Sequence, residues 1–256
     1  MAQPHAGLWA VVPVKLIAET KQRLAPLLAS PERAALACAM LGDVLSALTQ
    51  ARGLDGVLVV TGDAQAAAIA RAAGALVLHD DQNAGTSAAA NAAARHLSAS
   101  GCAGMLVVPA DVPLITSVDV ERIIAAHRDA PSVTLAPASM DGGTNALACS
   151  PPGAIPFCFG DESFARHCDA ASALGIEPQI VRLARIGQDI DRPEDVAAFL
   201  RCASRTRTHA YLAALPIGER ISSVSSSSRA REGVAIPGVS ATFVRPRIAS
   251  SRGSLP

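Results

Sequence analysis

The chain has 256 residues, a mass of 26.0 kDa, a formal net charge of zero and 50% hydrophobic residues, which favours one globular domain and leaves two small ones open. No apolar run reaches the ~20 residues that cross a bilayer, and the N-terminus lacks the basic and apolar regions of a signal peptide. The six cysteines form no CxxC pair, which favours reduced thiols in a cytoplasmic protein.

Short Val- and Leu-rich runs alternate with Ala-rich helical stretches over residues 8–127. This alternation is typical of βαβ units, in which parallel strands form one sheet that helices cover. Because the joining loops are short, we expect them to gather along one edge of the sheet. The runs predict strands at 8–14, 56–61, 76–79 and 105–109 and helices at 30–50, 63–73, 87–98 and 116–127, with Ser30 capping the first helix and Thr116 the fourth.

Beyond residue 131 the alternation is less regular. Strands are predicted at 132–137, 145–149 and 179–183, with a helix at 162–174 before the last of them. A final helix begins at residues 191–194, where Asp191 is a candidate for the cap and Glu194 a candidate for completing a capping box. The pattern as a whole predicts an α/β fold with a mostly parallel sheet.

Charge divides the chain into two parts. Residues 1–200 hold 13 Lys and Arg against 20 Asp and Glu, a net charge of −7, whereas residues 201–256 hold 9 Arg against 2 acids, a net charge of +7. Beyond about Leu215 the chain is rich in Ser, Arg, Pro and Gly, a composition that cannot bury a core. We therefore predict one domain over residues 1–215 and a disordered basic tail over residues 216–256.

Both lysines of the chain, Lys15 and Lys21, follow the first predicted strand, while the other 20 basic residues are arginines. An ammonium is a compact donor that reaches a phosphate oxygen where a guanidinium fork does not fit. With Arg23, these lysines are predicted to grip nucleotide phosphates as catalytic residues, although solvated loop lysines would also fit the pattern. The chain has neither GxGxxG nor GxxxxGK[ST], so a dinucleotide fold and a P-loop are not supported.

Three aspartates are candidate metal ligands. Asp111 directly follows an apolar strand, and a buried carboxylate there is costly unless it is paired or metal-bound. Asp189 and Asp191 are two residues apart, so in an extended segment both carboxylates face the same way. Together the three would form an oxygen-only site suited to Mg²⁺ that bridges nucleotide phosphates. A turn aspartate at 111 and a helix cap at 191 are the alternative interpretations.

Two glycine-containing segments are candidates for anion binding. Thr144 follows a Gly-Gly pair at 142–143, and Ser163 follows Gly160 at the start of a predicted helix. Glycine lets the backbone approach a ligand, and hydroxyls with helix N–H groups can hold an anion. A hairpin turn would equally explain the Gly-Gly pair. His167 is the one histidine that we place near an anion.

Six segments in chain order carry a family resemblance. They read Val12-Pro13-Val14-Lys15 with Lys21 and Arg23-Leu24; Val60-Thr61-Gly62-Asp63; Pro109-Ala110-Asp111-Val112-Pro113-Leu114; Gly143-Thr144-Asn145-Ala146-Leu147; Phe159-Gly160 with Ser163-Phe164 and His167; and Asp189-Ile190-Asp191 with Pro193-Glu194-Asp195. Together, over residues 8–212, they resemble the 2-phospho-L-lactate guanylyltransferase family, which builds the phospho-carboxylate end of coenzyme F-420.

The resemblance implies a single-domain, three-layer nucleotidyltransferase fold. It also implies an enzyme that condenses GTP with a phosphorylated three-carbon acid, giving a guanosine-diphospho product and pyrophosphate with Mg²⁺ as cofactor. The implied positions are Pro13, Lys15, Thr61, Asp63 and Gly85 for GTP, Thr144, Gly160 and Ser163 for the phospho-acid, and Asp111, Asp189 and Asp191 for the metal.

The acceptor and the reaction class keep alternatives open. Family members use 2-phospho-L-lactate, phosphoenolpyruvate or 3-phospho-D-glycerate. The Ala- and Arg-rich composition, which suggests bacterial coding, argues against 2-phospho-L-lactate. Between the other two acids the sequence is silent, and 3-phospho-D-glycerate is the acceptor that we favour. The rival hypotheses are another nucleotidyltransferase of the same fold, resembling molybdenum-cofactor guanylyltransferases, and a non-catalytic GTP-binding regulatory protein. The tail has little aromatic interleaving, which argues against nucleic-acid binding. The sequence leaves a homodimer open.

Overall fold

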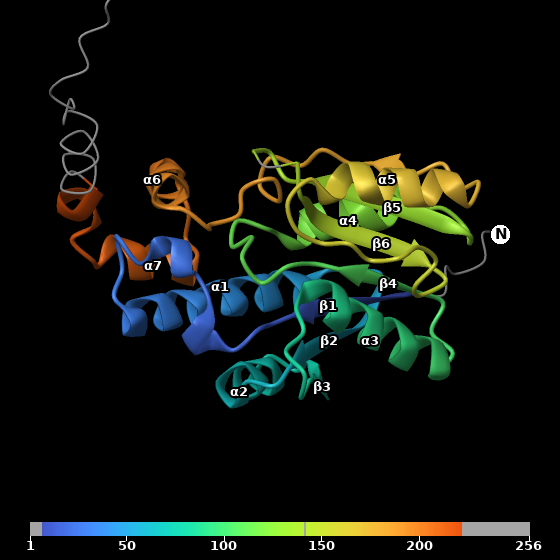
Figure 1. The fold of residues 1–256 in the computed structure, drawn as a ribbon, viewed down its shortest axis with the longest axis horizontal. Helices are drawn as coiled ribbons and strands as arrows, with labels where there is room; N and C mark the ends of the chain where they lie inside the picture. Colours follow the sequence, from blue (N-terminus) through green and yellow to red (C-terminus); the bar gives the residue numbers. More distant parts are fainter. Residues whose placement is uncertain (1–6, 141, 222–256) are drawn as a thin grey trace, which may run out of the picture.

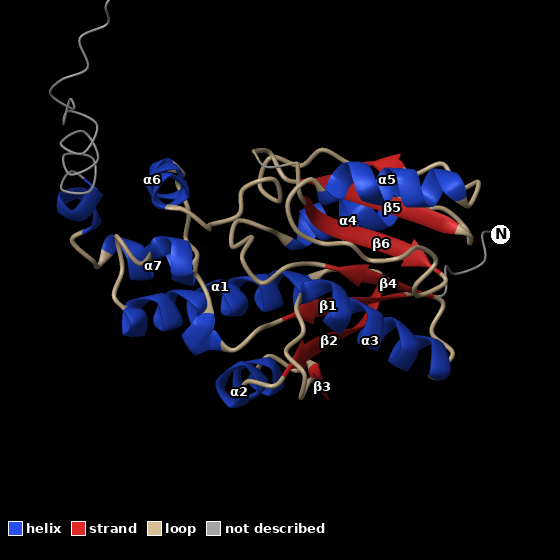
Figure 2. Cartoon of the chain, in the orientation of Figure 1, coloured by secondary structure: helices blue, strands red, loops and turns tan. Residues whose placement is uncertain are grey.

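A seven-stranded sheet forms the centre of the structure, a computed structural model that describes residues 7–140 and 142–221 (Figures 1 and 2). Its strand order is β3-β2-β1-β4-β6-β5-β7. Of these strands only β6 runs against the others, since its pairings with β4 and β5 are antiparallel and the remaining pairings are parallel. The predicted α/β class with a mostly parallel sheet is confirmed. The strands are β1 (Leu8–Pro13), β2 (Leu54–Thr61), β3 (Leu76–His79), β4 (Gly104–Val107), β5 (Ser132–Pro137), β6 (Thr144–Ser150) and β7 (Gln179–Ile180).

Helices cover both faces of the sheet, which makes three layers. Buried residues of α1, α2 and α4 belong to one hydrophobic cluster, and those of α3 and α5 to the cluster on the opposite face. Two 3₁₀ turns, η1 and η2, lie between β1 and α1. The helical elements are η1 (Ile17–Glu19), η2 (Gln22–Leu24), α1 (Ser30–Gln50), α2 (Ala64–Ala72), α3 (Thr86–Ala99), α4 (Ser117–Ala126), α5 (Ser163–Ala173), α6 (Pro193–Arg201) and α7 (Arg207–Ala213).

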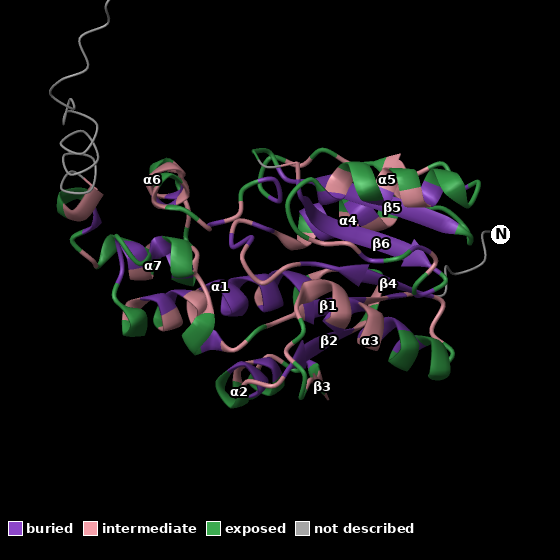
Figure 3. Cartoon of the chain, in the orientation of Figure 1, coloured by how far each residue is buried: buried purple, intermediate pink, exposed green. Residues whose placement is uncertain are grey.

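The central strands are buried on both faces, as Figure 3 shows for β1, β4 and β6. Successive side chains of a strand point to opposite faces, so Val12 joins the cluster under α1 while Val11 joins the cluster under α3. The same alternation places Leu106 with Val12 and Met105 with Val11. Small and branched side chains thus fill both interfaces, which explains how a chain with 3% aromatic residues builds its core.

A third hydrophobic cluster lies beyond the end of the sheet, where α6 and α7 pack beside the N-terminal half of α1 (Figure 1). The sequence did not predict α7. Its first turn is fixed by Asp43 of α1, whose carboxylate accepts hydrogen bonds from the N–H of Arg207 at 2.9 Å and from the N–H and hydroxyl of Thr208 at 2.9 and 2.6 Å.

Two predicted helix caps are wrong. Helix α1 is capped one residue earlier than expected, at Ala29, whose N–H donates to the Glu32 carboxylate at 2.8 Å. Helix α6 is capped at Arg192, because Pro193 is its first residue and the Asp195 carboxylate, at the third position, reaches back to the Arg192 N–H at 2.7 Å. By contrast, the Thr116 cap of α4 is confirmed.

The described structure continues past the expected start of the tail at residue 216. Ile217 is 2% exposed in the third cluster, and Arg220 forms two hydrogen bonds with the Glu32 carboxylate, at 2.8 and 2.9 Å. The expected boundary at residue 215 therefore falls too early, because an isolated Ile and Arg in a polar stretch gave no sign of their partners on α1. The rest of the predicted tail, residues 222–256, lies outside the described residues.

Two further features of the structure concern the cysteines and the possibility of a membrane-spanning helix. The six thiols are all free. Over residues 7–140 and 142–221, no helix combines the length and the apolar character needed to cross a bilayer. The strand predicted at 179–183 is shorter than expected, since only Gln179–Ile180 pair with β5.

Candidate active site

The site lies where the chain order of the strands reverses. From β1 the chain adds β2 and β3 on one side and then returns to place β4 on the other side of β1. At such a reversal the loops after two neighbouring parallel strands diverge and leave a crevice at their carboxyl ends. The segment carrying Lys15 and Lys21 follows β1, and Asp111 follows β4, so the fold brings them to the same crevice.

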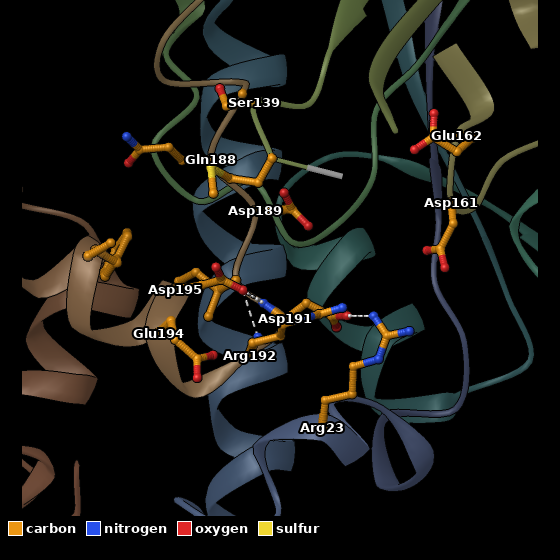
Figure 4. A pocket seen from close by; sticks show the side chains of 15 residues that line it. Arg23, Ser139, Asp161, Glu162, Gln188, Asp189, Asp191, Arg192, Glu194 and Asp195 are labelled. Atoms are coloured by element: carbon orange, nitrogen blue, oxygen red, sulfur yellow. Dashed lines mark hydrogen bonds and ion pairs between the residues drawn. The ribbon is translucent and has the colours of Figure 1, made fainter. Parts of the chain in front are cut away.

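Lys21 is the centre of an ion network in this crevice. Its Nζ lies 2.7 Å from Oδ2 of Asp111 and 3.4 Å from Oδ1 of Asp191. The second oxygen of Asp191 accepts a hydrogen bond from Arg23 Nη1 at 2.7 Å, which Figure 4 shows. Lys21 is held in the left-handed backbone region, with φ 55° and ψ 37°, and its side chain is 7% exposed.

The network shifts the pKa values of Lys21 and Asp191 towards their charged forms. Burial alone would lower the pKa of Lys21, but the carboxylates of Asp111 and Asp191, with a smaller contribution from Asp189, raise it above its ordinary value. Burial would conversely raise the pKa of Asp191, but Lys21 and Arg23 together hold that pKa below its usual range. An ammonium and a carboxylate that stay ionised are groups that a phosphate-transfer site requires.

Backbone and amide contacts hold the three aspartates near one another. The N–H of Ile190 donates to the carbonyl of Asp111 at 3.1 Å, which ties the segment after β7 to the segment after β4. Asn145 Nδ2 donates to the carbonyl of Ile186 at 2.8 Å and to Oδ1 of Asp189 at 3.4 Å. Figure 4 shows Asp189 and Asp191 on this one segment, across the pocket from Asp161 and Glu162.

The three-aspartate metal site is not formed as predicted. Within the described part of the chain, no group of three or more His, Cys, Asp or Glu is arranged to hold a metal ion. Two of the three carboxylates, from Asp111 and Asp191, do reach a common point, which the ammonium of Lys21 occupies. Mg²⁺ is usually held by one or two carboxylates together with substrate phosphates and waters. The donor set of Asp111 and Asp191 therefore fits Mg²⁺, with Asp189 beside it.

Two cavities adjoin at this network, because Arg23 and Asp191 line both of them. The smaller, about 360 Å³, is also lined by Pro13, Lys15 and Thr86 and lies on the β1 side. The larger, about 570 Å³, is lined by residues after β5, before α5 and around α6, among them Ser139, Asp161, Glu162, Asp189 and Asp195. A substrate in each cavity would meet the other at the ion network.

The predicted nucleotide residues divide into two groups. Pro13 and Lys15 line the smaller cavity, and Lys15 is exposed. Asp63 is instead the cap of α2: one carboxylate oxygen accepts from the N–H groups of Gln65 and Ala66, and the other from Ile17 N–H at 2.9 Å. Thr61 is 1% exposed and accepts from Asp63 N–H. Neither Thr61 nor Asp63 lines the cavity, so both support the loop after β1.

Gly85 precedes α3 at the rim of the smaller cavity. Its φ of 100° favours glycine, and a Cβ built there would meet no atom within 4 Å. The next residue, Thr86, lines the cavity. The N-terminus of this 14-residue helix thus borders the space beside Lys15 and Lys21, and free N–H groups at a helix start favour anions.

The predicted acceptor residues meet one another but are mostly buried. Ser163 Oγ lies 3.3 Å from Thr144 Oγ1, which lies 2.9 Å from His167 Nδ1. Thr144 is 4% exposed and Ser163 is fully buried. Gly160 is exposed, has φ 124°, and accepts from Ser163 N–H at 3.1 Å. The structure thus brings Thr144 and Ser163 together, and neither of them lines the two cavities. Their contact with the acceptor stays a prediction.

Sequence reasoning missed the residues that tether the segment carrying Asp189 and Asp191. Arg185 makes two hydrogen bonds to Asp119 of α4, at 2.6 and 2.8 Å, and Asp119 is 1% exposed. Asn145 is the other tether. Its place between Thr144 and an apolar strand was visible in the sequence, whereas nothing in the sequence paired Arg185 with Asp119.

Comparison with known proteins agrees with this geometry. The family model described as "Guanylyl transferase CofC like" matches residues 8–235. The chain is 38% identical over 191 residues to a phosphoenolpyruvate guanylyltransferase of Rubrobacter xylanophilus, covering 75% of this chain and 92% of the relative. It is 42% identical over 189 residues to the protein of that name in Roseiflexus castenholzii, covering 74% and 86%.

One further relative is named for a different acceptor, and two solved structures share the fold. A 3-phospho-D-glycerate guanylyltransferase of Colwellia psychrerythraea is 37% identical over 186 residues, covering 73% of this chain and 88% of the relative. A Desulfovibrio desulfuricans protein assigned to the nucleotide-diphospho-sugar transferases superposes with a TM-score of 0.66 at 16% identity, covering 84% and 96%. A nucleotidyl transferase from Methanothermobacter superposes with a TM-score of 0.54 at 19% identity, covering 75% and 95%. These structures confirm the predicted nucleotidyltransferase-like fold.

The active-site geometry, the fold and the relatives point the same way. The match to the family model spans the β1 loop, the β4 loop and the segment that carries Asp189 and Asp191. The chain is a nucleotidyltransferase, and it belongs to the CofC-like guanylyl transferase family.

Proposed function

We propose that the protein transfers the guanylyl group of GTP to the phosphate of a phosphorylated three-carbon acid, for coenzyme F-420 biosynthesis. The observation that carries this proposal is the network of Lys21, Asp111, Asp191 and Arg23 at the border of two cavities. Two cavities that meet at charged groups suit a reaction that joins two anionic substrates. The names of relatives at 37–42% identity support the same reaction class.

In this reaction an acceptor phosphate oxygen attacks the α-phosphorus of GTP, a new P–O bond forms, and the bond to pyrophosphate breaks. The barrier is largely charge repulsion and alignment, because both partners are anions. Lys15 and Thr86 border the smaller cavity, where they would receive the nucleotide phosphates. Lys21 and Arg23 stand between the cavities and would neutralise the phosphates where they meet. No covalent nucleophile is needed.

Asp111 and Asp191 would hold Mg²⁺, with Asp189 orienting the site from the same segment. When bound, the ion would neutralise phosphate charge and align the two substrates. The two carboxylates now pair with Lys21, so the ammonium has to leave them for the metal and becomes available to a phosphate. An ammonium on a flexible stem with three donors is suited to such an exchange.

The acceptor is proposed to enter the larger cavity. The buried hydroxyl of Ser163 lies at the start of α5, beside that of Thr144 at the start of β6, and Asp161 and Glu162 just before α5 line the cavity. The relatives are named for phosphoenolpyruvate and for 3-phospho-D-glycerate, and both are three-carbon frames with a carboxylate and a phosphate. The preference for 3-phospho-D-glycerate over phosphoenolpyruvate stays a prediction.

The deciding experiment offers the full chain labelled GTP and Mg²⁺ with an equimolar mixture of phosphoenolpyruvate, 3-phospho-D-glycerate and 2-phospho-L-lactate. Mass spectrometry identifies the product, and pyrophosphate release is measured in parallel. We expect one guanosine-diphospho acid to predominate, with stoichiometric pyrophosphate. Parallel reactions with ATP and CTP test the choice of nucleotide. Absence of any guanylylated acid, or transfer to a molybdopterin instead, would contradict the proposal.

A further inference from the structure

A buried chain of three polar side chains lies between β6 and α5. His167 is fully buried, and its two ring nitrogens each have one partner: Nε2 lies 3.0 Å from the N–H of Cys158, and Nδ1 lies 2.9 Å from Thr144 Oγ1. Thr144 Oγ1 in turn lies 3.3 Å from Ser163 Oγ. The family comparisons and the proposed reaction leave His167 without a role.

The partners fix which ring nitrogen carries the proton. A backbone N–H can only donate, so Nε2 of His167 must accept from Cys158 and has no hydrogen of its own. A neutral imidazole then carries its proton on Nδ1, which donates to Thr144 Oγ1. Burial, with the neighbouring charge of Arg166, lowers the pKa of His167 to about 4. The ring is therefore neutral near pH 7, and one tautomer is enforced.

This tautomer decides which hydroxyl can donate a hydrogen bond outside the trio of His167, Thr144 and Ser163. The Nδ1–H and the two hydroxyls bring three hydrogens to only two contacts, so one hydroxyl hydrogen remains without a place inside the trio. In this structure Ser163 donates to Thr144. The hydroxyl hydrogen of Thr144 is therefore the one that has no acceptor within the trio. Thr144 is also the member of this pair with any exposed surface, 4% against none for Ser163. With the opposite tautomer, Thr144 would have to donate to His167 and would lose this hydrogen.

The ring is also held in place from its side. Phe159 meets it edge-on, with ring centroids 5.1 Å apart, and the N–H of Phe159 donates to Ser87 Oγ in the first turn of α3 at 2.9 Å. His167 of α5 thus packs against Phe159, which is itself hydrogen-bonded to α3, the helix that borders the smaller cavity. Its rotation is restricted by packing as well as by its two hydrogen bonds.

We propose that His167 is a positioning residue, which donates from Nδ1 to Thr144 and thereby turns the threonine hydroxyl outward as a hydrogen-bond donor to an anionic oxygen of the acceptor acid. This inference rests on the proposed function, since it assumes that the acceptor reaches Thr144. A hydroxyl with a fixed direction binds a carboxylate or phosphate oxygen better than one that must reorient, because the ordering cost is already met.

Two substitutions separate the two ends of the ring. In His167→Gln the amide oxygen can replace Nε2 as the acceptor for Cys158 N–H, but the donor to Thr144 is lost. In His167→Asn the amide nitrogen can replace Nδ1 as that donor. We expect His167→Gln to raise the KM for the acceptor about tenfold, the size of one lost hydrogen bond to a charged group, with the KM for GTP within twofold. His167→Asn should stay within about threefold of the wild type.

His96→Gln on the exposed end of α3 is the matched control and should leave both constants unchanged. Equal acceptor KM values for wild type and His167→Gln, or equal rises for acceptor and GTP, would overturn the role of His167. A wild-type protein that transfers guanylyl to none of the three acids would instead overturn the proposed function. The two failures are thus distinguishable.

A measurement on the wild-type protein covers the case in which the buried variants do not fold. Two-bond ¹H–¹⁵N correlation spectra report the tautomer of each histidine, and assignment through backbone connectivity in the wild-type protein identifies the resonances of His167. We expect a neutral ring protonated at Nδ1 at pH 6. A ring protonated at Nε2, or an imidazolium, would overturn the inference whatever the kinetic result.

Discussion

Lys21 combines two features that cost free energy. A non-glycine residue in the left-handed region is strained by about 1–3 kcal/mol, and a side chain that is 7% exposed carries a buried charge. Such a combination persists only where the surroundings determine it fully, here through Asp111 and Asp191. The strain therefore points to function, and it makes the identity of this cation testable.

Replacing Lys21 with arginine keeps the charge but changes its shape. The planar guanidinium is wider than an ammonium and does not fit between two carboxylates that approach one nitrogen at 2.7 and 3.4 Å. We expect Lys21→Arg to lower kcat for guanylyl transfer at least ~100-fold, nearly as much as Lys21→Met. Steady-state kinetics checks this. A Lys21→Arg enzyme with more than half of the wild-type kcat would show that charge alone suffices.

The carboxylates should differ in their effect on Mg²⁺. Asp111 contacts the point where a cation sits, whereas Asp189 has its oxygen near Asn145. Asp111→Asn should therefore lower Mg²⁺-dependent turnover at least ~100-fold, and Asp189→Asn by less. Turnover measured against Mg²⁺ concentration, with Mn²⁺ binding as a second reading, compares the two. A larger loss in Asp189→Asn would place the metal nearer to Asp189 than the geometry indicates.

His167 should make stability depend on acid pH. Its folded pKa, about 4, lies below the ordinary 6.5, so between these values the unfolded chain binds more protons and stability rises with pH. As pH falls from about 6.5 towards 4, this stability, about 3 kcal/mol, is progressively lost. Urea unfolding at several pH values should show a shallower slope over this window in His167→Gln. Identical slopes would mean that the histidine does not titrate on unfolding.

At the level of elements, periodicity predicted most of the sheet. The Val-rich runs of β1 and β2 and the Ala-rich helices between them are local patterns, and local patterns are what a sequence displays. At the start of α6 the prediction failed where two acids competed. Arg192 is the cap and Asp195 accepts from its N–H, while Asp191 pairs with Lys21 and Arg23. That competition depends on residues about 170 positions away, which no local pattern contains.

Helix α7 escaped prediction for the same reason, and its attachment can be tested. The carboxylate of Asp43, 9% exposed, accepts three hydrogen bonds from Arg207 and Thr208. Asp43→Ala would leave these donors buried without a partner, so we expect a loss of about 2–3 kcal/mol in the free energy of unfolding. Exposed Asp169→Ala on α5 is the control and should change it by less than about 0.5 kcal/mol. Equal effects would show that Asp43 does not anchor α7.

For the molecule as a whole, the sequence predicted which residues lie close together more accurately than it predicted the role of each residue. Asp111, Asp191 and Lys21 come from three loops, and the expectation that parallel strands deliver their loops to one edge brought them together correctly. The role of Asp63 was misread, because a cap and a ligand both require an acid after a strand. Burial and pairing separate those roles, and both depend on the complete fold.

The C-terminal boundary offers a test at the same scale. Ile217 buries its side chain against the cluster formed by α1, α6 and α7, and Arg220 pairs with Glu32 near the start of α1. A chain ending at Ile221 keeps both contacts, whereas one ending at Leu215 loses them. Burying an isoleucine contributes about 2 kcal/mol. We therefore expect the shorter chain to be less stable by at least that amount in urea unfolding.

Activity should follow a different pattern, because neither cavity is lined by residues beyond Phe199. At temperatures where both truncated chains are folded, we expect kcat and both KM values within about twofold of the full chain, since the ion network at Lys21 would be intact. A chain ending at Ile221 that is folded but inactive would show that residues 222–256 take part in the chemistry. Equal stability of the two truncated chains would instead show that the contacts of Ile217 and Arg220 do not hold the α1, α6 and α7 cluster together.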